Sequence, residues 1–365
     1  MRFRRTAIAA CLLVAGCTAA PAPPAIAWTA VTLPADGPVA TLDAAYCAGV
    51  WWVVGGRLGP GDATRPAAWT SGDGRTWRSV AFKALPGSLY GPQDLISSVG
   101  CADGRVAMIG AKPGGAHGIP RISTWRLNGG AMAEVSAPFD TYGGDSAVDV
   151  THIAAGPAGF LITGDRTSGA AVWLSADGTG FRLIAGAPGL ASDATAQTVA
   201  RDAVAAGGQW VIVGGGTSPV NADERPAVWL TRDGTRFTRA PVPAWPGRSD
   251  PPGQPRYVEL QRVVRIGAGL VAAGPRGDRL GAWRGPDWQA AGAFGTATDG
   301  VQSLTVAGAG RLIATSAGTL WRSDDDGGTW RPLAVPARAG DRLAVAGGPH
   351  GVLLAGAGRV WTAPQ

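Results

Sequence analysis

One short stretch carries the side chains best suited to chemistry. Residues 256–262 read Arg-Tyr-Val-Glu-Leu-Gln-Arg, which places Tyr257 two positions before Glu259 and puts Arg262 close behind. Alternate side chains of a β-strand share a face, so the phenol and the carboxylate would lie side by side. A tyrosine assisted by a carboxylate beside arginines can serve as a nucleophile. The same residues also suit a charged rim at the start of a strand, and we favour that interpretation over catalysis by Tyr257, Glu259 and Arg262.

Histidine and cysteine point to little further catalytic chemistry. We expect neither a metal nor a cofactor, because metal-ligand spacing joins none of the three histidines, His117, His152 and His350. Of the four cysteines, Cys11 and Cys17 lie in the N-terminal segment, which leaves Cys47 and Cys101. Such a pair in an exported chain is typical of a disulfide rather than a metal site or a nucleophile.

A repeat indicates the architecture that positions these residues. Short apolar runs bounded by glycine-rich turns are typical of buried strands, and each precedes a tryptophan: Trp69, Trp125, Trp173, Trp229, Trp283, Trp321 and Trp361. Seven such units in residues 28–365 have about 48 residues each, the size of a four-stranded propeller blade. We therefore predict an all-β fold, a single seven-bladed β-propeller of four-stranded blades over 28–365.

The last unit is incomplete. After Trp361 the sequence holds no fourth strand, whereas residues 28–34 resemble the segments that begin at Trp77 and Trp330, which we take as outer strands. We expect the N-terminal strand to complete the last blade and close the ring, which pairs its open edges.

A ring of polar residues is predicted at the channel mouth, where the innermost strands begin. When these strands are aligned on Cys47, Cys101 and their equivalents, a polar residue stands four positions earlier in every blade: Asp43, Ser97, Thr151, Asp202, Arg262, Gln302 and Asp341. We take this ring as the candidate binding site, and the alternative is that these residues solvate the funnel and bond to exposed backbone. The alignment also places Cys47 and Cys101 at equivalent positions of adjacent blades, where a disulfide forms only if their Cα atoms lie within about 7 Å.

The turns between the later strands of the units carry a motif. Residues 323–330 fit the pattern Ser-x-Asp-x-Gly-x-Thr-Trp in full, and shortened copies surround Asp73, Asp177 and Asp233. This pattern resembles the Asp-box, or BNR repeat, of sialidase-like propellers. In that family the boxes lie at the blade periphery, so the resemblance implies a structural role for Asp73, Asp177, Asp233, Ser323, Asp325, Gly327 and Trp330.

The same resemblance implies a possible activity. Sialidases use an arginine triad, a tyrosine nucleophile assisted by glutamate, and an acidic acid/base residue. This chain lacks the family's Arg-Ile-Pro motif, since residues 119–121 have the order Ile-Pro-Arg, and it contains only three glutamates. Both departures put a sialidase-type activity in doubt.

The N-terminus resembles a bacterial lipoprotein signal. Three arginines precede a short apolar run that ends in Val14-Ala15-Gly16-Cys17, which is similar to a lipobox. The resemblance implies a signal peptide over 1–16, a lipid on Cys17 and an Ala/Pro tether over 17–27. An ordinary secretory signal cut after Ala20 or Ala27 is the alternative, and both versions export the chain.

These features predict a lipid-anchored, non-catalytic propeller on the outer face of the cytoplasmic membrane. It would bind a protein or glycan partner through the channel mouth and two long loops, 216–226 and 243–255. A sialidase-type glycoside hydrolase with a divergent site is one alternative. An assembly factor for a membrane complex, the role of some Asp-box propellers in photosynthetic membranes, is another. Without the signal arginines, 29 basic residues face 26 acidic ones, a net charge of +3 that does not suggest nucleic-acid binding. We expect a monomer.

Overall fold

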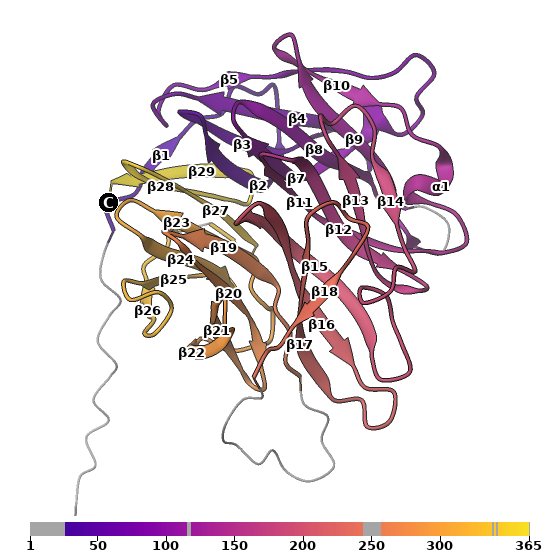
Figure 1. Cartoon of the computed structure of the whole chain (residues 1–365). Helices are drawn as coiled ribbons and strands as arrows, with labels where there is room; N and C mark the ends of the chain where they lie inside the picture. The colour runs from indigo at the N-terminus through magenta and orange to yellow at the C-terminus, as the bar shows by residue number, and fades with distance from the viewer. Residues whose placement is uncertain (1–25, 115–117, 244–256, 338, 341, 365) are drawn as a thin grey trace, which may run out of the picture.

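Seven β-sheets stand in a ring around a central channel (Figure 1). The computed structural model describes residues 26–114, 118–243, 257–337, 339–340 and 342–364. Within each blade except two and seven the strands follow one another in sequence order, and the first strand of each blade contacts the first strands of both neighbours. This arrangement confirms the predicted seven-bladed propeller. The predicted signal peptide, Cys17 and the predicted tether up to residue 25 lie outside the described residues.

Blades one to four follow in chain order. Blade one contains β2 (Val39–Cys47), β3 (Val50–Leu58), β4 (Thr64–Ser71) and β5 (Arg78–Ser79). Blade two contains β7 (Leu95–Ala102), β8 (Arg105–Lys112), β9 (Arg121–Asn128) and β10 (Ala131–Val135). Blade three contains β11 (Ala147–Gly156), β12 (Gly159–Arg166), β13 (Gly169–Ser175) and β14 (Arg182–Ile184). Blade four contains β15 (Gln197–Ala206), β16 (Gln209–Thr217), β17 (Glu224–Thr231) and β18 (Thr238–Ala240).

Blades five to seven complete the ring. Blade five contains β19 (Arg262–Ile266), β20 (Gly269–Arg276), β21 (Arg279–Gly285) and β22 (Gln289–Phe294). Blade six contains β23 (Ser303–Ala307), β24 (Arg311–Ser316), β25 (Thr319–Ser323) and β26 (Arg331–Leu333). Blade seven contains β27 (Leu343–Gly348), β28 (Gly351–Gly356), β29 (Arg359–Pro364) and β1 (Thr29–Val31). Within the described part of the chain, two short helices lie between strands, η1 (Gly91–Gln93) and α1 (Phe139–Tyr142).

The hydrophobic core is divided into seven clusters, each between two adjacent blades. The third strand of most blades contributes a tryptophan to such a cluster, and Trp69, Trp125, Trp173 and Trp229 are completely buried. Burial of these large side chains between sheets is the main force that holds neighbouring blades face to face.

The turns after the third strands form compact hydrogen-bonded loops. Asp325 accepts hydrogen bonds from the Ser323 hydroxyl (2.9 Å), the Thr329 amide (2.8 Å) and the Thr329 hydroxyl (2.9 Å). Gly327 has a φ of +82°, which favours glycine, and its carbonyl accepts a bond from the Trp330 indole (3.0 Å). These residues lie between β25 and β26, at the outer part of blade six.

The N-terminal strand completes blade seven, as predicted. β1 pairs with β29 in an antiparallel register from Thr29–Thr362 to Val31–Val360, so the first and the last strands of the described chain lie side by side (Figure 1). The Trp28 indole donates a hydrogen bond of 2.8 Å to the carbonyl of Ala334, which follows β26 of blade six. The closing segment therefore contacts two blades.

Blade two departs from the simple pattern by gaining a fifth strand. We expected residues 77–82 to form the outer strand of blade one, but only β5 pairs with β4. The next residues form β6 (Ala81–Lys83), which pairs in parallel with β10 of blade two. The connection between these blades therefore covers the outer edge of the second one.

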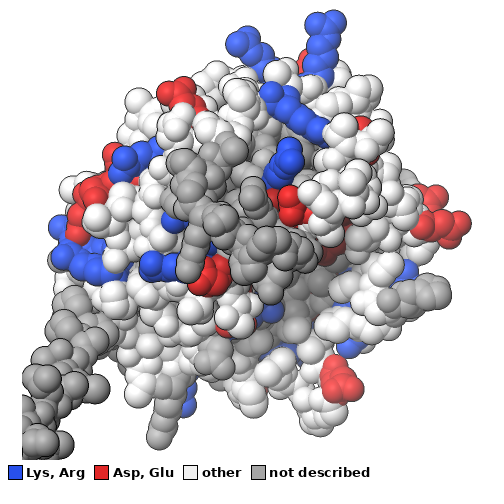
Figure 2. Space-filling model, turned by 90° about the horizontal axis from the view of Figure 1, so that it is seen from below, with Lys and Arg blue, Asp and Glu red and all other residues white. Residues whose placement is uncertain are grey.

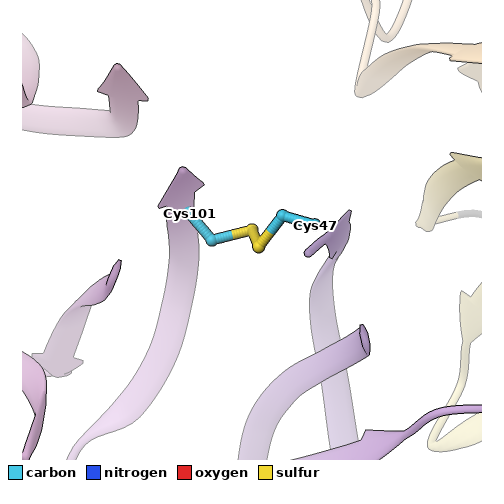
Figure 3. Close-up of a disulfide and its surroundings, with 2 residues drawn as sticks. All are labelled: Cys47 and Cys101. Atoms are coloured by element: carbon cyan, nitrogen blue, oxygen red, sulfur yellow. A yellow bond between two sulfur atoms is a disulfide. The ribbon is translucent and has the colours of Figure 1, made fainter. Parts of the chain in front are cut away.

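A disulfide also joins blades one and two. Cys47 at the end of β2 is bonded to Cys101 near the end of β7, with Cα atoms 6.2 Å apart, which confirms the predicted bridge (Figure 3). The two cysteines are not in equivalent positions, because one further residue follows Cys101 in its strand. Both helices among the described residues are too short to span a bilayer.

Candidate functional site

Four ionisable side chains from innermost strands meet in the channel: Asp43 of β2, His152 of β11, Asp202 of β15 and Arg262 of β19. His152 Nδ1 lies 2.8 Å from Asp202 Oδ1, and His152 Nε2 lies 3.9 Å from Asp43 Oδ2. The Arg262 Nε donates a 3.0 Å hydrogen bond to the carbonyl of Gln302. The imidazole thus lies between two carboxylates, with a guanidinium close by.

The charges of this layer are coupled. Burial disfavours the protonated imidazole, but Asp202 and Asp43 outweigh it and raise the pKa of His152. Burial raises the pKa of Asp43, and His152 only partly offsets this effect. Burial also disfavours the ionised form of Asp202, but there His152 and Arg262 outweigh burial and lower the pKa. The carboxylates thus favour the protonated form of His152, and the cations favour the ionised form of Asp202.

Members of the predicted ring also bind the backbone of the next blade. Asp43 Oδ2 accepts a hydrogen bond from the Val99 amide, and Asp202 Oδ2 accepts one from the Val263 amide, each at 2.9 Å. The side-chain oxygen of Gln302 accepts a bond of 2.9 Å from the Leu343 amide. Because the innermost strands leave these amides without strand partners, the side chains satisfy them and link adjacent blades. This is the backbone-bonding role that we gave as the alternative to ligand binding.

Five predicted ring residues line one channel cavity of about 270 Å³: Asp43, Ser97, Asp202, Arg262 and Gln302. Thr151 does not line this cavity, since its hydroxyl lies 3.0 Å from the Thr163 carbonyl and 3.1 Å from the Arg201 carbonyl. His152 faces the channel instead, and sequence reasoning missed it. Asp341 lies outside the described residues.

The displacement from Thr151 to His152 has its cause in the alignment. The strand was aligned on Ala155, whereas β11 ends one residue later, at Gly156. In β2 and β15 the aligned residue is the last of its strand, and counting four positions back from it gives a residue that lines the channel. The same count from Gly156 gives His152.

The candidate catalytic residues form a second polar cluster. The Tyr257 hydroxyl lies 3.4 Å from Glu259 Oε2, which also accepts a bond of 2.9 Å from the Gln261 side chain. Glu259 Oε1 accepts a 2.7 Å bond from Nε of Arg201, a residue that sequence reasoning missed. The structure therefore brings Tyr257 and Glu259 together with Arg201, whereas Arg262 turns into the channel.

The electrostatics of this cluster do not activate the phenol. Burial and the nearby carboxylates of Glu259 and Glu224 raise the pKa of Tyr257 to about 12. Burial and Glu259 raise the pKa of Glu224 to about 7. A phenol with a raised pKa is a poorer nucleophile at neutral pH. The Glu259–Arg201 ion pair joins the segment before blade five to β15 of blade four, which suits a structural link.

A groove lies over the mouth end of blade two, with a volume of about 790 Å³. We call it the blade-two groove, and define it by the residues that the argument uses: Leu85, Tyr90, Arg121, Ser123, Glu134 and Phe139. A second hollow of about 420 Å³ shares Ile119, Pro120 and Ile122 with this groove and reaches Ser97 and Thr151. The two hollows thus form one continuous depression from blade two to the channel mouth.

Exposed apolar side chains gather along this depression. Of the eight large hydrophobic side chains exposed among the described residues, five belong to the depression or its rim: Leu85, Leu89, Tyr90, Phe139 and Val148. Leu89 is 72% exposed and Phe139 is 64% exposed. The face in Figure 2 shows acidic and basic side chains interspersed among uncharged ones. Among the described residues, no three His, Cys, Asp or Glu side chains form a group that could hold a metal ion.

Known proteins resemble the chain in fold. No family model matches it, and no curated protein matches its sequence. A solved structure described as YCF48 bound to D1 peptide is 15% identical, with a TM-score of 0.55 over 94% of this chain and 98% of that one. The WD40 propeller domain of Doa1 is 10% identical, with a TM-score of 0.57 over 93% and 97% of the two chains. A catalytically inactive virginiamycin B lyase from Staphylococcus aureus, with quinupristin, is 12% identical, with a TM-score of 0.56 over 93% and 99%. These likenesses support the propeller fold, and the Asp-box resemblance continues to rest on the motif alone.

Proposed function

We propose that this chain is an exported, lipid-anchored propeller that binds a protein partner and performs no catalysis. The observation that carries the proposal is the gathering of exposed apolar side chains along the depression from blade two to the channel mouth. Exposed apolar patches on a folded protein typically mark a surface that another molecule covers. The rigid ring of blades supports this surface.

The proposed location rests on two features. The disulfide between Cys47 and Cys101 fits an oxidising compartment outside the cytoplasm. The lipobox-like sequence before Cys17 would provide the anchor, with lipid chains at the membrane and the propeller beyond a short tether. An assembly factor for a membrane complex would be one protein of this kind, and its partner would be a subunit of that complex.

The polar clusters support binding more than chemistry. The carboxylates of the channel layer hold amides of neighbouring blades, and Glu259 holds Arg201, so these groups have structural partners. A similar fold, described as YCF48 bound to D1 peptide, has a peptide as its ligand. A protein partner is the simplest ligand for an apolar, open depression of this size.

Site-specific photo-cross-linking tests the proposal. A benzophenone amino acid would replace Phe139 in one variant and Arg182, which is exposed on the outer strand β14 of blade three, in a control variant. Both variants would be irradiated in membranes of the producing cell. We expect a discrete protein adduct from position 139 and none from position 182. Equal or absent adducts at the two positions would remove the proposal, and binding to a glycan array instead would identify a glycan ligand.

The contact between Tyr257 and Glu259 favours a second candidate, a sialidase-type glycoside hydrolase. It is tested by turnover of a panel of fluorogenic glycosides, sialosides included, with Glu259→Gln measured beside the unchanged chain. Hydrolysis that disappears in the variant would establish an active site before blade five and contradict the non-catalytic proposal. We expect no turnover in either protein.

A further inference from the structure

The blade-two groove has an open strand edge at its floor. β9 begins at Arg121, but β10 pairs only with residues 124–128 of it, and the last pair is Val135–Thr124. On its other side β9 pairs with β8 along its length, down to Lys112–Arg121. Among the described residues, Arg121–Ser123 therefore has no partner strand on its outer side. Residues 121–124 and 135–138 both line the groove, so the two strands separate around it.

An open edge of this kind favours one type of ligand. Its outward peptide groups present donors and acceptors in the spacing of a β-strand. An extended peptide can add to such an edge through main-chain hydrogen bonds, while its alternate side chains enter pockets on either side. The edge of three residues matches an added strand of about 10 Å, at roughly 3.3 Å per residue.

Arg121 stands at this edge between aromatic side chains. Its guanidinium carbon lies 5.7 Å from the centre of the Tyr90 ring and 5.3 Å from the centre of the Phe139 ring. The two rings belong to different walls, since Tyr90 precedes η1 and Phe139 begins α1. The contacts with both rings position the guanidinium through cation–π attraction.

The guanidinium has donors to offer. The Arg121 side chain forms neither a hydrogen bond nor an ion pair within the part of the chain that the structure describes. A planar guanidinium has five N–H donors, in a geometry that matches a carboxylate in two parallel bonds. A side chain held by aromatic contacts and lacking a carboxylate partner is therefore suited to receive one from a ligand.

The other charged side chains of the groove are acidic, so Arg121 is the residue that can bind a carboxylate of a ligand. Glu134 already accepts hydrogen bonds from the Leu85 amide (2.9 Å) and the Ser88 hydroxyl (2.7 Å), which fix one wall. Asp145 is exposed, so solvent and salt screen its charge. Among the described residues that line the groove, Arg121 is the one basic residue, and it would be the cationic partner of an arriving carboxylate.

We propose that the blade-two groove binds an extended segment of the partner protein as an added strand on Arg121–Ser123, with a carboxylate of that segment on Arg121. The inference rests on the proposed function and specifies its ligand. Side chains two positions before and after the acidic residue share its face of the added strand, toward the aromatic rings. The recognised segment is therefore acidic at its centre and apolar at the alternate positions around it.

Selection from a random heptapeptide phage library tests the inference, with the full chain, purified in detergent, as the target. We expect the enriched peptides to carry Asp or Glu with apolar residues two positions away. Arg121→Gln should raise the Kd of such a peptide about 10-fold or more, because a charge-assisted bidentate contact is lost. Arg182→Gln removes an exposed arginine from β14 of blade three and should leave the Kd unchanged. Enrichment of basic or neutral peptides, or equal Kd values for both variants, would overturn the inference.

Backbone methylation separates strand addition from other peptide contacts. An added strand uses the amides of one edge only, so N-methylation of one alternating set should abolish binding while methylation of the other set is tolerated. Tolerance of both sets would overturn strand addition. Failure of the peptide selection beside a specific adduct at position 139 would remove this inference alone, whereas failure of both experiments would also remove the proposed function.

Discussion

Replacing Asp94 should change how the stability of the protein depends on pH. Asp94 is completely buried just before β7, and its Oδ2 accepts a 3.0 Å hydrogen bond from the Trp125 indole. Burial raises the pKa of this carboxyl to about 7, from 3.8 for an exposed aspartate. The hydrogen bond from Trp125 opposes this rise but does not cancel it.

The sign of the effect follows from proton binding. Between pH 4 and 7 the unfolded chain has lost the Asp94 proton while the folded chain retains it, so the free energy of unfolding falls as the pH rises. A rise of roughly three pKa units corresponds to about 4 kcal/mol at most, at about 1.4 kcal/mol per unit. Asp94→Asn has no proton to lose and keeps an oxygen that can accept the Trp125 bond. The variant should therefore gain stability relative to the unchanged chain as the pH rises, by up to about 4 kcal/mol.

Urea unfolding of both proteins at pH 4, 5.5 and 7.5, followed by tryptophan fluorescence, measures this difference. Other carboxyls with raised pKa values, such as Asp165 at about 6, occur in both proteins and cancel in the comparison. A difference in unfolding free energy that changes by less than about 1 kcal/mol across this range, or that changes in the opposite direction, would refute the reasoning.

Three further substitutions test how the ring is held together, each by urea unfolding. Replacing Cys47 and Cys101 by serine removes a disulfide that closes a loop with a sequence separation of 54, and should lower the free energy of unfolding by about 4 kcal/mol in the chain-entropy model. Identical urea unfolding curves of the unchanged chain with and without reductant would contradict this. Trp28→Ala removes the indole that joins the closing strand to Ala334 and should cost about 2 kcal/mol, since the ring is only partly buried; an unchanged midpoint would contradict a closing role. Asp325→Ala should cost about 1 kcal/mol and leave peptide binding intact, because its bonds stay within one outer turn; a loss of peptide binding would contradict a local role.

The sequence predicted the fold well because the blade is repeated. Each unit places a tryptophan such as Trp173 in the same environment between two sheets, so the same sequence pattern recurs and can be recognised even where single copies are irregular. The closing of the ring was predictable for the same reason. Residues 28–34 have the pattern of an outer strand, but no inner strands of the same blade precede them. The pairing of β6 with blade two was not predictable. After β5 the chain can reach the outer edges of both blade one and blade two, and no residue type indicates which edge it joins.

The candidate site was only partly predictable. Asp43 and Asp202 were found because they are polar at a position where strands are otherwise apolar. His152 was missed because the strand was aligned on Ala155, one residue before the end of β11, and no residue type marks that end. The blade-two groove was missed altogether, since its walls are single segments, such as 85–90 and 136–142, that do not repeat from blade to blade. Only the three-dimensional structure brings Tyr90, Arg121 and Phe139 together.

The shared strand β6 and the disulfide have a consequence for the thermodynamics of recognition. They bind blades one and two into one stiff block, and the bonds of Glu134 hold the segment after β6 against it. The protein side of the blade-two groove is thus preorganised, and most of the conformational entropy lost on association belongs to the peptide. Affinity should therefore improve more by cyclising the peptide into an extended form than by any further stiffening of the propeller.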